Sequence, residues 1–107
     1  MKELTLYETI FLMVIYRLED NAYGVRIREE ASKIKHRSLS YGTLYSYLDQ
    51  LTRKGYVSKH VGSPTAERGG RRKIFYRLSP RGVQALKSAH KLQNMIWDDA
   101  PSVLKEP

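Results

Sequence analysis

The stretch LSYGTLYSYLDQLTRKG, residues 39–55, places an uncommon set of polar side chains at helical spacing. Leu44, Leu48 and Leu51 recur at i, i+4 and i+7, so they form one apolar stripe of a helix. The opposite face carries hydrogen-bonding or positive side chains: Thr43, Ser46, Gln50 and Arg53. A helix that only needs to stay soluble usually mixes Lys with Glu. This face therefore suits a polar, anionic surface such as a DNA groove; the alternative is an ordinary surface helix rich in Ser, Thr and Tyr.

Three of these polar residues are suited to reading base edges: Thr43, Ser46 and Gln50. A glutamine amide can pair with adenine, and a threonine methyl can pack on the methyl of thymine. Tyr41 and Tyr45 lie near the start of the helix, where their hydroxyls are placed for phosphate or sugar contacts. For Tyr45, packing against the core is an equally open alternative. Tyr47 falls closer to the leucine stripe, so we expect it in the core.

The chain on both sides must position this helix. Ser40 stands where an N-cap is expected, and Gly55 stands where a C′ glycine ends a helix. After Gly55 the apolar period changes from 3.6 to 2, which predicts two strands, Tyr56 to Val61 and Lys73 to Leu78. The segment between them, Gly62 to Arg72, contains three glycines and one proline, as a long hairpin loop does.

This predicted hairpin loop is strongly basic. A Gly69-Gly70 pair lets the backbone approach another surface closely, and four cations surround it: Arg68, Arg71, Arg72 and Lys73. Arginine binds phosphate through two parallel hydrogen bonds or enters a narrow minor groove. Arg68 alternatively pairs with Glu67. A basic hairpin directly after a helix of this kind predicts a winged helix, with the loop as its wing.

A further helix is predicted before the polar one, from Tyr23 to about Lys33, with Asn21 as its cap. Its buried stripe is expected at Ile27, Ala31 and Ile34. The basic link Lys35-His36-Arg37-Ser38 then leads into the polar helix. Two helices joined by a short connection, the second carrying groove-type side chains, form a helix-turn-helix pattern.

The first predicted helix opens with a capping box, Thr5-x-x-Glu8, and runs to about Leu18. Its run IFLMVIY is apolar on nearly every side, and such a helix is buried all round. A chain of 107 residues offers few neighbours to surround a helix. We therefore expect its own domain to cover one side and a partner subunit to cover the other; a central core helix in a monomer is the alternative.

The last predicted helix starts at Ser79-Pro80, an N-cap followed by proline at N1, and runs to about Trp97. Its apolar residues step by four, three and four, which suits packing on another apolar helix, and the first helix of a second copy is the candidate. The predicted dimer interface contains Leu6, Ile10, Phe11, Val14, Ala85, Ala89, Leu92, Ile96 and Trp97. Residues 1–78 then form a DNA-binding domain, 79–97 a dimerisation helix and 98–107 a disordered tail.

Composition agrees with an anionic partner. The net charge is +8, and residues 21–80 hold 13 of the 19 basic residues but 4 of the 11 acidic ones. The absence of cysteine excludes a disulfide framework and a thiolate metal site. The apolar run Ile10 to Tyr16 is far shorter than the roughly 20 residues of a membrane-spanning helix, and Glu3 and Glu8 stand where a signal peptide is basic. We therefore expect a soluble, cytoplasmic protein that is not attached to a membrane.

Other function classes fit less well. The three histidines lie on the link, a strand and the last helix, none at the sequence spacing of a metal site with another ligand. No Ser–His–Asp order or phosphate-binding glycine loop is present. We predict neither enzyme activity nor a cofactor. RNA-binding tails repeat Arg-Gly-Gly, which occurs here once, inside a hairpin. A winged helix used only for protein contacts should lack a basic wing; these two classes stay as alternatives.

With these pieces in order, the sequence resembles the PadR-like family of transcriptional regulators from about Leu4 to Leu92. Five short motifs carry the resemblance, each on the element where the family has it. They are Ala22-Tyr23-Gly24 with Ile27; Ser40-x-Gly42-Thr43-Leu44-Tyr45 with Leu48 and Leu51; Lys54-Gly55-Tyr56-Val57; Arg68-Gly69-Gly70-Arg71 followed by Phe75-Tyr76-Arg77-Leu78; and Ser79-Pro80-x-Gly82 with Ala85-Leu86.

The resemblance implies a winged helix-turn-helix homodimer, mostly α-helical, that represses transcription from a partly palindromic operator. A single helix after the wing looks like the shorter subgroup, whose C-terminal helix packs on the first helix of the other subunit. Some relatives bind planar aromatic or cationic compounds at the dimer interface, where Trp97 would line a pocket or simply close the interface. Tyr23 resembles the family tyrosine that approaches the DNA backbone. The expected DNA contacts are Tyr23, Lys35, Arg37, Ser40, Tyr41, Thr43, Tyr45, Ser46, Gln50, Arg53, Arg68, Arg71, Arg72 and Lys73.

Overall fold

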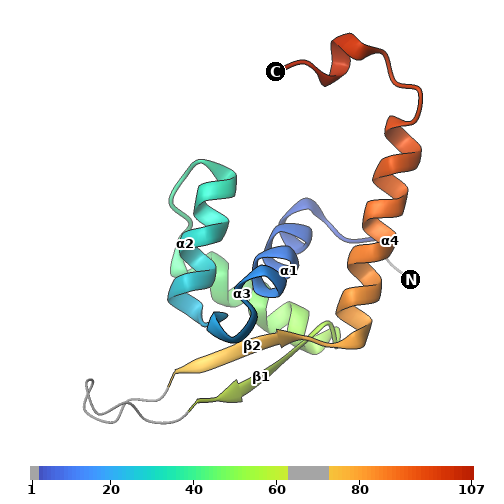
Figure 1. The fold of residues 1–107 in the computed structure, drawn as a ribbon. Helices are drawn as coiled ribbons and strands as arrows, with labels where there is room; N and C mark the ends of the chain where they lie inside the picture. Colours follow the sequence, from blue (N-terminus) through green and yellow to red (C-terminus); the bar gives the residue numbers. More distant parts are fainter. Residues whose placement is uncertain (1–2, 63–72) are drawn as a thin grey trace.

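In the computed structural model, which describes residues 3–62 and 73–107, three helices precede a two-stranded sheet and one long helix follows it (Figure 1). The order is α1 (Leu6–Leu18), η1 (Glu19–Asn21), α2 (Gly24–Lys35), α3 (Tyr41–Arg53), β1 (Val57–Val61), β2 (Ile74–Leu78), α4 (Pro80–Trp97) and η3 (Ser102–Lys105). The strands pair antiparallel, with Val57 opposite Leu78 and Val61 opposite Ile74. This order confirms the predicted winged helix-turn-helix.

Most of the predicted helix boundaries are confirmed by their caps. In the capping box of α1, the Thr5 hydroxyl accepts from the amide of Glu8, and the Glu8 carboxylate accepts from the amide of Thr5. Ser40 caps α3 through the amide of Thr43, at 3.0 Å. Gly55 follows that helix with a φ of +79°, a left-handed conformation that favours glycine.

The start of α2 differs from the prediction. The N-cap residue is Tyr23, without a side-chain cap, and Asn21 lies in η1. The reason is that the chain before α2 is extended so that it can pair with the sheet. The amide of Tyr76 donates to the carbonyl of Ala22 at 2.8 Å, and Tyr23 forms a β-bridge with Phe75. Long-range pairing with β2 therefore decides where α2 begins.

The last residue of the buried stripe predicted for α2 is wrong, whereas the first two are confirmed. Ile27 and Ala31 are fully buried, but Ile34 is 43% exposed. The stripe continues by a step of four to Lys35, whose ammonium lies 4.7 Å from the centre of the Tyr7 ring. A basic residue thus occupies the last inward position of α2, with its charge at the domain edge.

The core forms between α1, α2, α3 and the sheet. The largest fully buried side chains are Phe11, Leu12, Val14, Ile15, Ile27, Leu44, Leu48 and Leu51. The leucine stripe of α3 is therefore its buried face, as predicted. Tyr47 is partly buried against this core, which confirms its predicted place; its ring centre lies 5.4 Å from that of Phe11.

Four residues predicted for the dimer interface belong instead to the core of their own chain. Ile10 is 7% exposed, Phe11 0%, Val14 2% and Ala85 3%, so these side chains have no surface left for a second copy. The prediction was wrong because α2, α3, β2 and α4 all pack on α1 and cover more of it than its length suggested. The outward surface of α1 instead includes Leu6 and Tyr16.

Helix α4 begins against the sheet and then leaves the domain (Figure 1). Gly82 lies so close to the strand that an added Cβ would stand 2.1 Å from the carbonyl oxygen of Tyr56, and this approach sets the direction of α4. Ala89 and Leu92 are half-buried, whereas Ile96 and Trp97 are 61% and 45% exposed. Beyond α4 the chain turns back through Asp99, and the short η3 exposes Val103 and Leu104. The disorder predicted for residues 98–107 stays a prediction.

Candidate nucleic-acid interface

The outward face of α3 carries the polar residues that the sequence singled out. Ser46 and Arg53 are exposed, and Thr43 and Gln50 are half-buried. The Ser40 hydroxyl accepts from the Thr43 amide and donates to the Thr43 hydroxyl, at 3.0 and 2.9 Å. Ser40 therefore acts as the cap of α3. Among the described residues, the side chains of Ser46 and Gln50 have no hydrogen-bond partner, so their donors and acceptors are free for base edges.

Two exposed tyrosines stand at the start of α3. The rings of Tyr41 and Tyr45 are stacked with their centres 6.4 Å apart, and the residues are 45% and 46% exposed. The Tyr45 hydroxyl lies against the start of α2, where a Cβ added to Gly24 would come within 2.5 Å of it. Tyr45 is thus both packed at its tip and open to solvent along its ring, which keeps both of its predicted roles open.

Arg28 holds this end of α3 in place, and its role had no signal in the sequence. Its Nε donates to the carbonyl of Leu39 at 2.6 Å, and its Nη2 donates to the hydroxyl of Ser38 at 2.9 Å. The guanidinium carbon lies 4.5 Å from the centre of the Tyr41 ring. The residue contacts partners ten to thirteen positions away, so no local spacing could have identified it. It ties α2 to the link before α3 and to the first residue of α3.

At the base of the wing, the structure brings together Tyr23 and Lys73, two of the residues expected to contact DNA. The Lys73 ammonium lies 4.1 Å from the centre of the Tyr23 ring, and the edge of that ring packs on Phe75 with centres 5.6 Å apart. The predicted contacts Arg68, Arg71 and Arg72 lie outside the described residues.

The basic link contacts α1 through the side chains of Lys35 and Arg37. Arg37 Nη2 donates to the Tyr7 hydroxyl at 2.6 Å, and the Lys35 ammonium lies over the same ring. The hydrogen bond from Arg37, together with the charges of both cations, lowers the pKa of the Tyr7 phenol although partial burial opposes the shift. Tyr7 in turn stacks on Tyr47 of α3, with ring centres 5.3 Å apart. Lys35 and Arg37, two of the predicted charge contacts, are therefore connected to α3 through the stacked rings of Tyr7 and Tyr47.

The described residues contain fifteen basic side chains, of which four make an ion pair with a carboxylate. Arg26, Lys33, Lys54 and Arg77 make ion pairs with carboxylates. Lys35, Arg37, Arg53 and Lys73, all predicted to contact DNA, make no ion pair with a carboxylate in the described part of the chain. Their charge is therefore left for an external anion.

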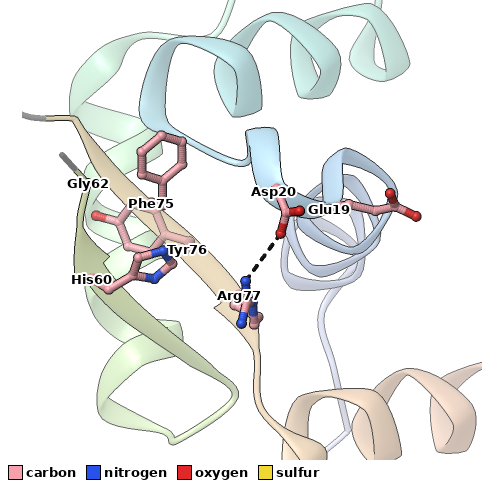
Figure 2. Close-up of a pocket in the computed structure, with 7 residues that line it drawn as sticks. All are labelled: Glu19, Asp20, His60, Gly62, Phe75, Tyr76 and Arg77. Atoms are coloured by element: carbon pink, nitrogen blue, oxygen red, sulfur yellow. Dashed lines mark hydrogen bonds and ion pairs between the residues drawn. The ribbon is translucent and has the colours of Figure 1, made fainter. Parts of the chain in front are cut away.

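A cavity of about 260 Å³ lies beside β2. Figure 2 shows its lining residues: Glu19, Asp20, His60, Gly62, Phe75, Tyr76 and Arg77. Arg77 reaches across to Asp20 at 3.2 Å, and the His60 ring stacks on Phe75. Burial raises the pKa of Tyr76, and the nearby Tyr45 and Asp49 add to the shift. The imidazole thus packs on an aromatic ring, and the described residues that line the cavity form no nucleophile–base pair.

Comparison with known proteins shows to which protein family the chain belongs. The model of the family described as "Transcriptional regulator PadR-like family" matches residues 12–88. The chain belongs to the PadR-like family. It is therefore a DNA-binding transcriptional regulator and not an enzyme.

Several solved structures have a fold similar to that of this chain. RosR of H. salinarum is 25% identical, with a TM-score of 0.72 over 94% of this chain and 84% of that one. A PadR family regulator from Clostridium difficile is 23% identical, with a TM-score of 0.67 over 86% and 91% of the two chains. A PadR-like regulator from Bacillus cereus is 18% identical, with a TM-score of 0.70 over 94% and 92%. No curated protein sequence matches the chain.

For this PadR-like regulator, the described residues contain no helix long and apolar enough to cross a membrane. They also contain no group of three or more His, Cys, Asp or Glu side chains placed to hold a metal ion.

Proposed function

We propose that the protein is a homodimeric repressor that binds a partly palindromic operator in double-stranded DNA in the cytoplasm. The observation that carries the proposal is the outward face of α3: Ser46 and Gln50 have no partner in the described chain, and Arg53 makes no ion pair there. Such a face fits the major groove, where amide and hydroxyl groups can read base edges.

The surroundings of α3 complete the proposed interface. Lys35 and Arg37 flank it on one side, and Tyr23 with Lys73 flanks it at the base of the wing. These residues would contact backbone phosphates, which position a protein without reading sequence. Tyr41 and Tyr45 would add contacts at the start of the helix. The basic residues of the wing, Arg68, Arg71 and Arg72, would enter the adjacent minor groove.

The dimer is proposed from the exposed apolar surface of α4. Ile96 and Trp97 are exposed, and Leu6 of α1 is 67% exposed. Exposed apolar residues grouped at one end of a domain commonly mark an interaction site. We propose that this end of α4, with Ala89 and Leu92, packs on the α1 surface around Leu6 of a second copy. Release by a small aromatic effector at the same interface is proposed from the family resemblance, with Trp97 as its candidate contact.

A selection of bound duplexes from a random pool tests this function. We expect a two-fold symmetric site whose half-sites lie about one helical turn apart, because two copies of α3 would enter successive major grooves. A single asymmetric site would contradict the dimer. Equal binding to duplex DNA, single strands and RNA at one salt concentration would favour the RNA-binding alternative, and no binding to any of them would favour a protein-interaction module.

A further inference from the structure

Tyr7 lies at the start of α1, outside every element that the winged-helix pattern assigns to DNA. Its side chain nevertheless joins the recognition helix and the basic link. The ring stacks on Tyr47 of α3 at 5.3 Å and on Phe11 at 6.4 Å, and the hydroxyl accepts a hydrogen bond from Arg37. The ammonium of Lys35 lies over the ring. Three side chains from α1, α2 and the link therefore meet at one point on the surface.

The hydrogen-bond donors of these three side chains are not all satisfied within the described part of the protein. Among the described residues, Arg37 donates one N–H to Tyr7, and Lys35 makes no ion pair with a carboxylate. The Tyr7 oxygen accepts, so its hydrogen remains free to donate. The nearest carboxylate along the chain, that of Glu8, is buried and bound to Lys54 and Thr5. It does not neutralise the two cations.

The end of α2 brings the link to this point. His36 adopts a left-handed conformation, with φ 55° and ψ 33°, and its amide donates to the carbonyl of Lys33. The amide of Arg37 donates to the carbonyl of Ser32. This closure ends the helix, in the manner of a C-terminal cap with one left-handed residue. Arg37 is thereby turned toward α1, where its guanidinium meets Tyr7.

We propose that Tyr7, Lys35 and Arg37 form one phosphate-binding site for the DNA backbone, with Tyr7 as a direct ligand supplied by α1. A guanidinium, an ammonium and a phenol hydroxyl are the donors that a phosphodiester accepts. The pKa of the Tyr7 phenol is lowered first by the hydrogen bond from Arg37 and then by the charges of Arg37 and Lys35, which agrees with this site. The stack on Tyr47 fixes the site relative to α3, so one phosphate is held at a set distance from the bases being read.

This inference rests on the proposed DNA-binding function, and the test separates the two. A duplex selected from a random pool is rebuilt with a single neutral methylphosphonate placed at each backbone position in turn. Wild-type protein and Tyr7→Phe are titrated with every duplex at one salt concentration. Tyr16→Phe is the matched control, because Tyr16 is an exposed tyrosine of the same helix whose hydroxyl has no hydrogen bond in the described chain.

We expect Tyr7→Phe to bind the unmodified duplex about tenfold more weakly, since each half of a dimer loses one hydrogen bond worth roughly threefold. Tyr16→Phe should bind like wild type. At one particular phosphate of each half-site, the methylphosphonate should weaken DNA binding by the wild type. The same methylphosphonate should weaken DNA binding by Tyr7→Phe much less. Arg37→Gln should lose sensitivity at that same phosphate, which checks the site with a second variant.

Failure of the inference has a distinct signature. If wild type binds duplex DNA but Tyr7→Phe and wild type respond alike at every phosphate, Tyr7 is not a ligand and the proposed function still stands. A saturable response of the free protein to inorganic phosphate, with no phosphate-specific loss on DNA, would assign the site to a free anion and overturn the proposal. Loss of all DNA binding by wild type would instead remove the proposed function itself.

Discussion

The two ends of the recognition helix are held by different chemistry. At its C-terminal end, Lys54 reaches the buried carboxylate of Glu8 in α1. At its N-terminal side, Arg28 packs on Tyr41, and Arg37 and Lys35 gather on Tyr7. A cation paired with a carboxylate contributes to the fold and has its charge cancelled. A cation held by an aromatic ring is positioned but stays charged. The charge of Lys54 is thus cancelled within the fold, whereas Lys35 and Arg37 keep their charge for a partner; Arg28 also stays charged but serves to position the start of α3.

Removing the carboxylate should break the first kind of contact and give the largest effect on stability. Glu8→Ala loses both the capping box of α1 and the ion pair with Lys54, so we expect the free energy of unfolding to fall by about 2 kcal/mol. Chemical denaturation measures this change. Glu3→Ala is the control, because Glu3 is exposed and makes no ion pair in the described residues. An equal loss in both variants would refute a special role for Glu8.

Removing a ring-held cation should act on DNA binding instead. Arg28→Ala frees the link and the start of α3, and we expect affinity for the selected duplex to fall about tenfold. The slope of log K against log salt should stay unchanged, because Arg28 positions other residues and does not itself contact phosphate. Arg26→Ala is the matched control on the same helix, since Arg26 pairs with Glu29. A fall in the salt slope would show that Arg28 is a direct contact.

A smaller effect should decide between the two roles of Tyr45. Gly24→Ala places a Cβ where the Tyr45 hydroxyl now lies, so the tip of that side chain must move. We expect the free energy of unfolding to change by less than about 0.5 kcal/mol, since alanine is the better helix former. DNA affinity should fall about threefold, as for one lost hydrogen bond. Unchanged affinity would make Tyr45 a packing residue only. Adding Gly24→Ala to Tyr45→Phe should have little further effect on binding.

The smallest expected effect is on the pH dependence of the free energy of unfolding, which tests the ion pair at the C-terminal end of the recognition helix. Burial of Glu8 works to raise its pKa, but the hydrogen bonds from Lys54 and Thr5 and the Lys54 charge outweigh it and lower the pKa below its ordinary value of 4.5. A group with a depressed folded-state pKa stabilises the fold above its ordinary pKa, and this contribution is lost as pH falls through the folded-state value. We expect Glu8→Gln to lose less stability than wild type between pH 6 and pH 3 in thermal melts. Parallel curves would contradict this.

Much of the fold was predictable because local signals agree with it. Thr5 with Glu8, Ser40, Gly55 and Ser79 mark helix ends by chemistry that needs no tertiary context. The start of α2 was not predictable, because its position depends on pairing between Ala22 and Tyr76. Likewise, periodicity could say that α1 is apolar on most sides but not how many elements of its own chain cover it.

The residues of the candidate site likewise include some that the sequence could predict and some that it could not. The exposed side chains of α3 follow from helix geometry alone, so Ser46 and Arg53 could be named from their spacing. The roles of Arg28 and Tyr7 depend on contacts over 10 to 11 and 30 positions. Neighbours on one helix face lie three or four positions apart, so helical spacing does not identify such pairs. Only the packed structure shows which cations are held by rings and which are cancelled by carboxylates.

The most direct test of the central claim is the salt dependence of binding to the selected duplex. Six cations per subunit are proposed to contact phosphate: Lys35, Arg37, Arg53, Arg71, Arg72 and Lys73. At a slope of about −0.9 for each phosphate, log K should fall with log salt at roughly −5 per subunit and roughly −11 for a dimer. A steep linear fall of this size is the predicted result. Binding that does not change with salt would contradict the account.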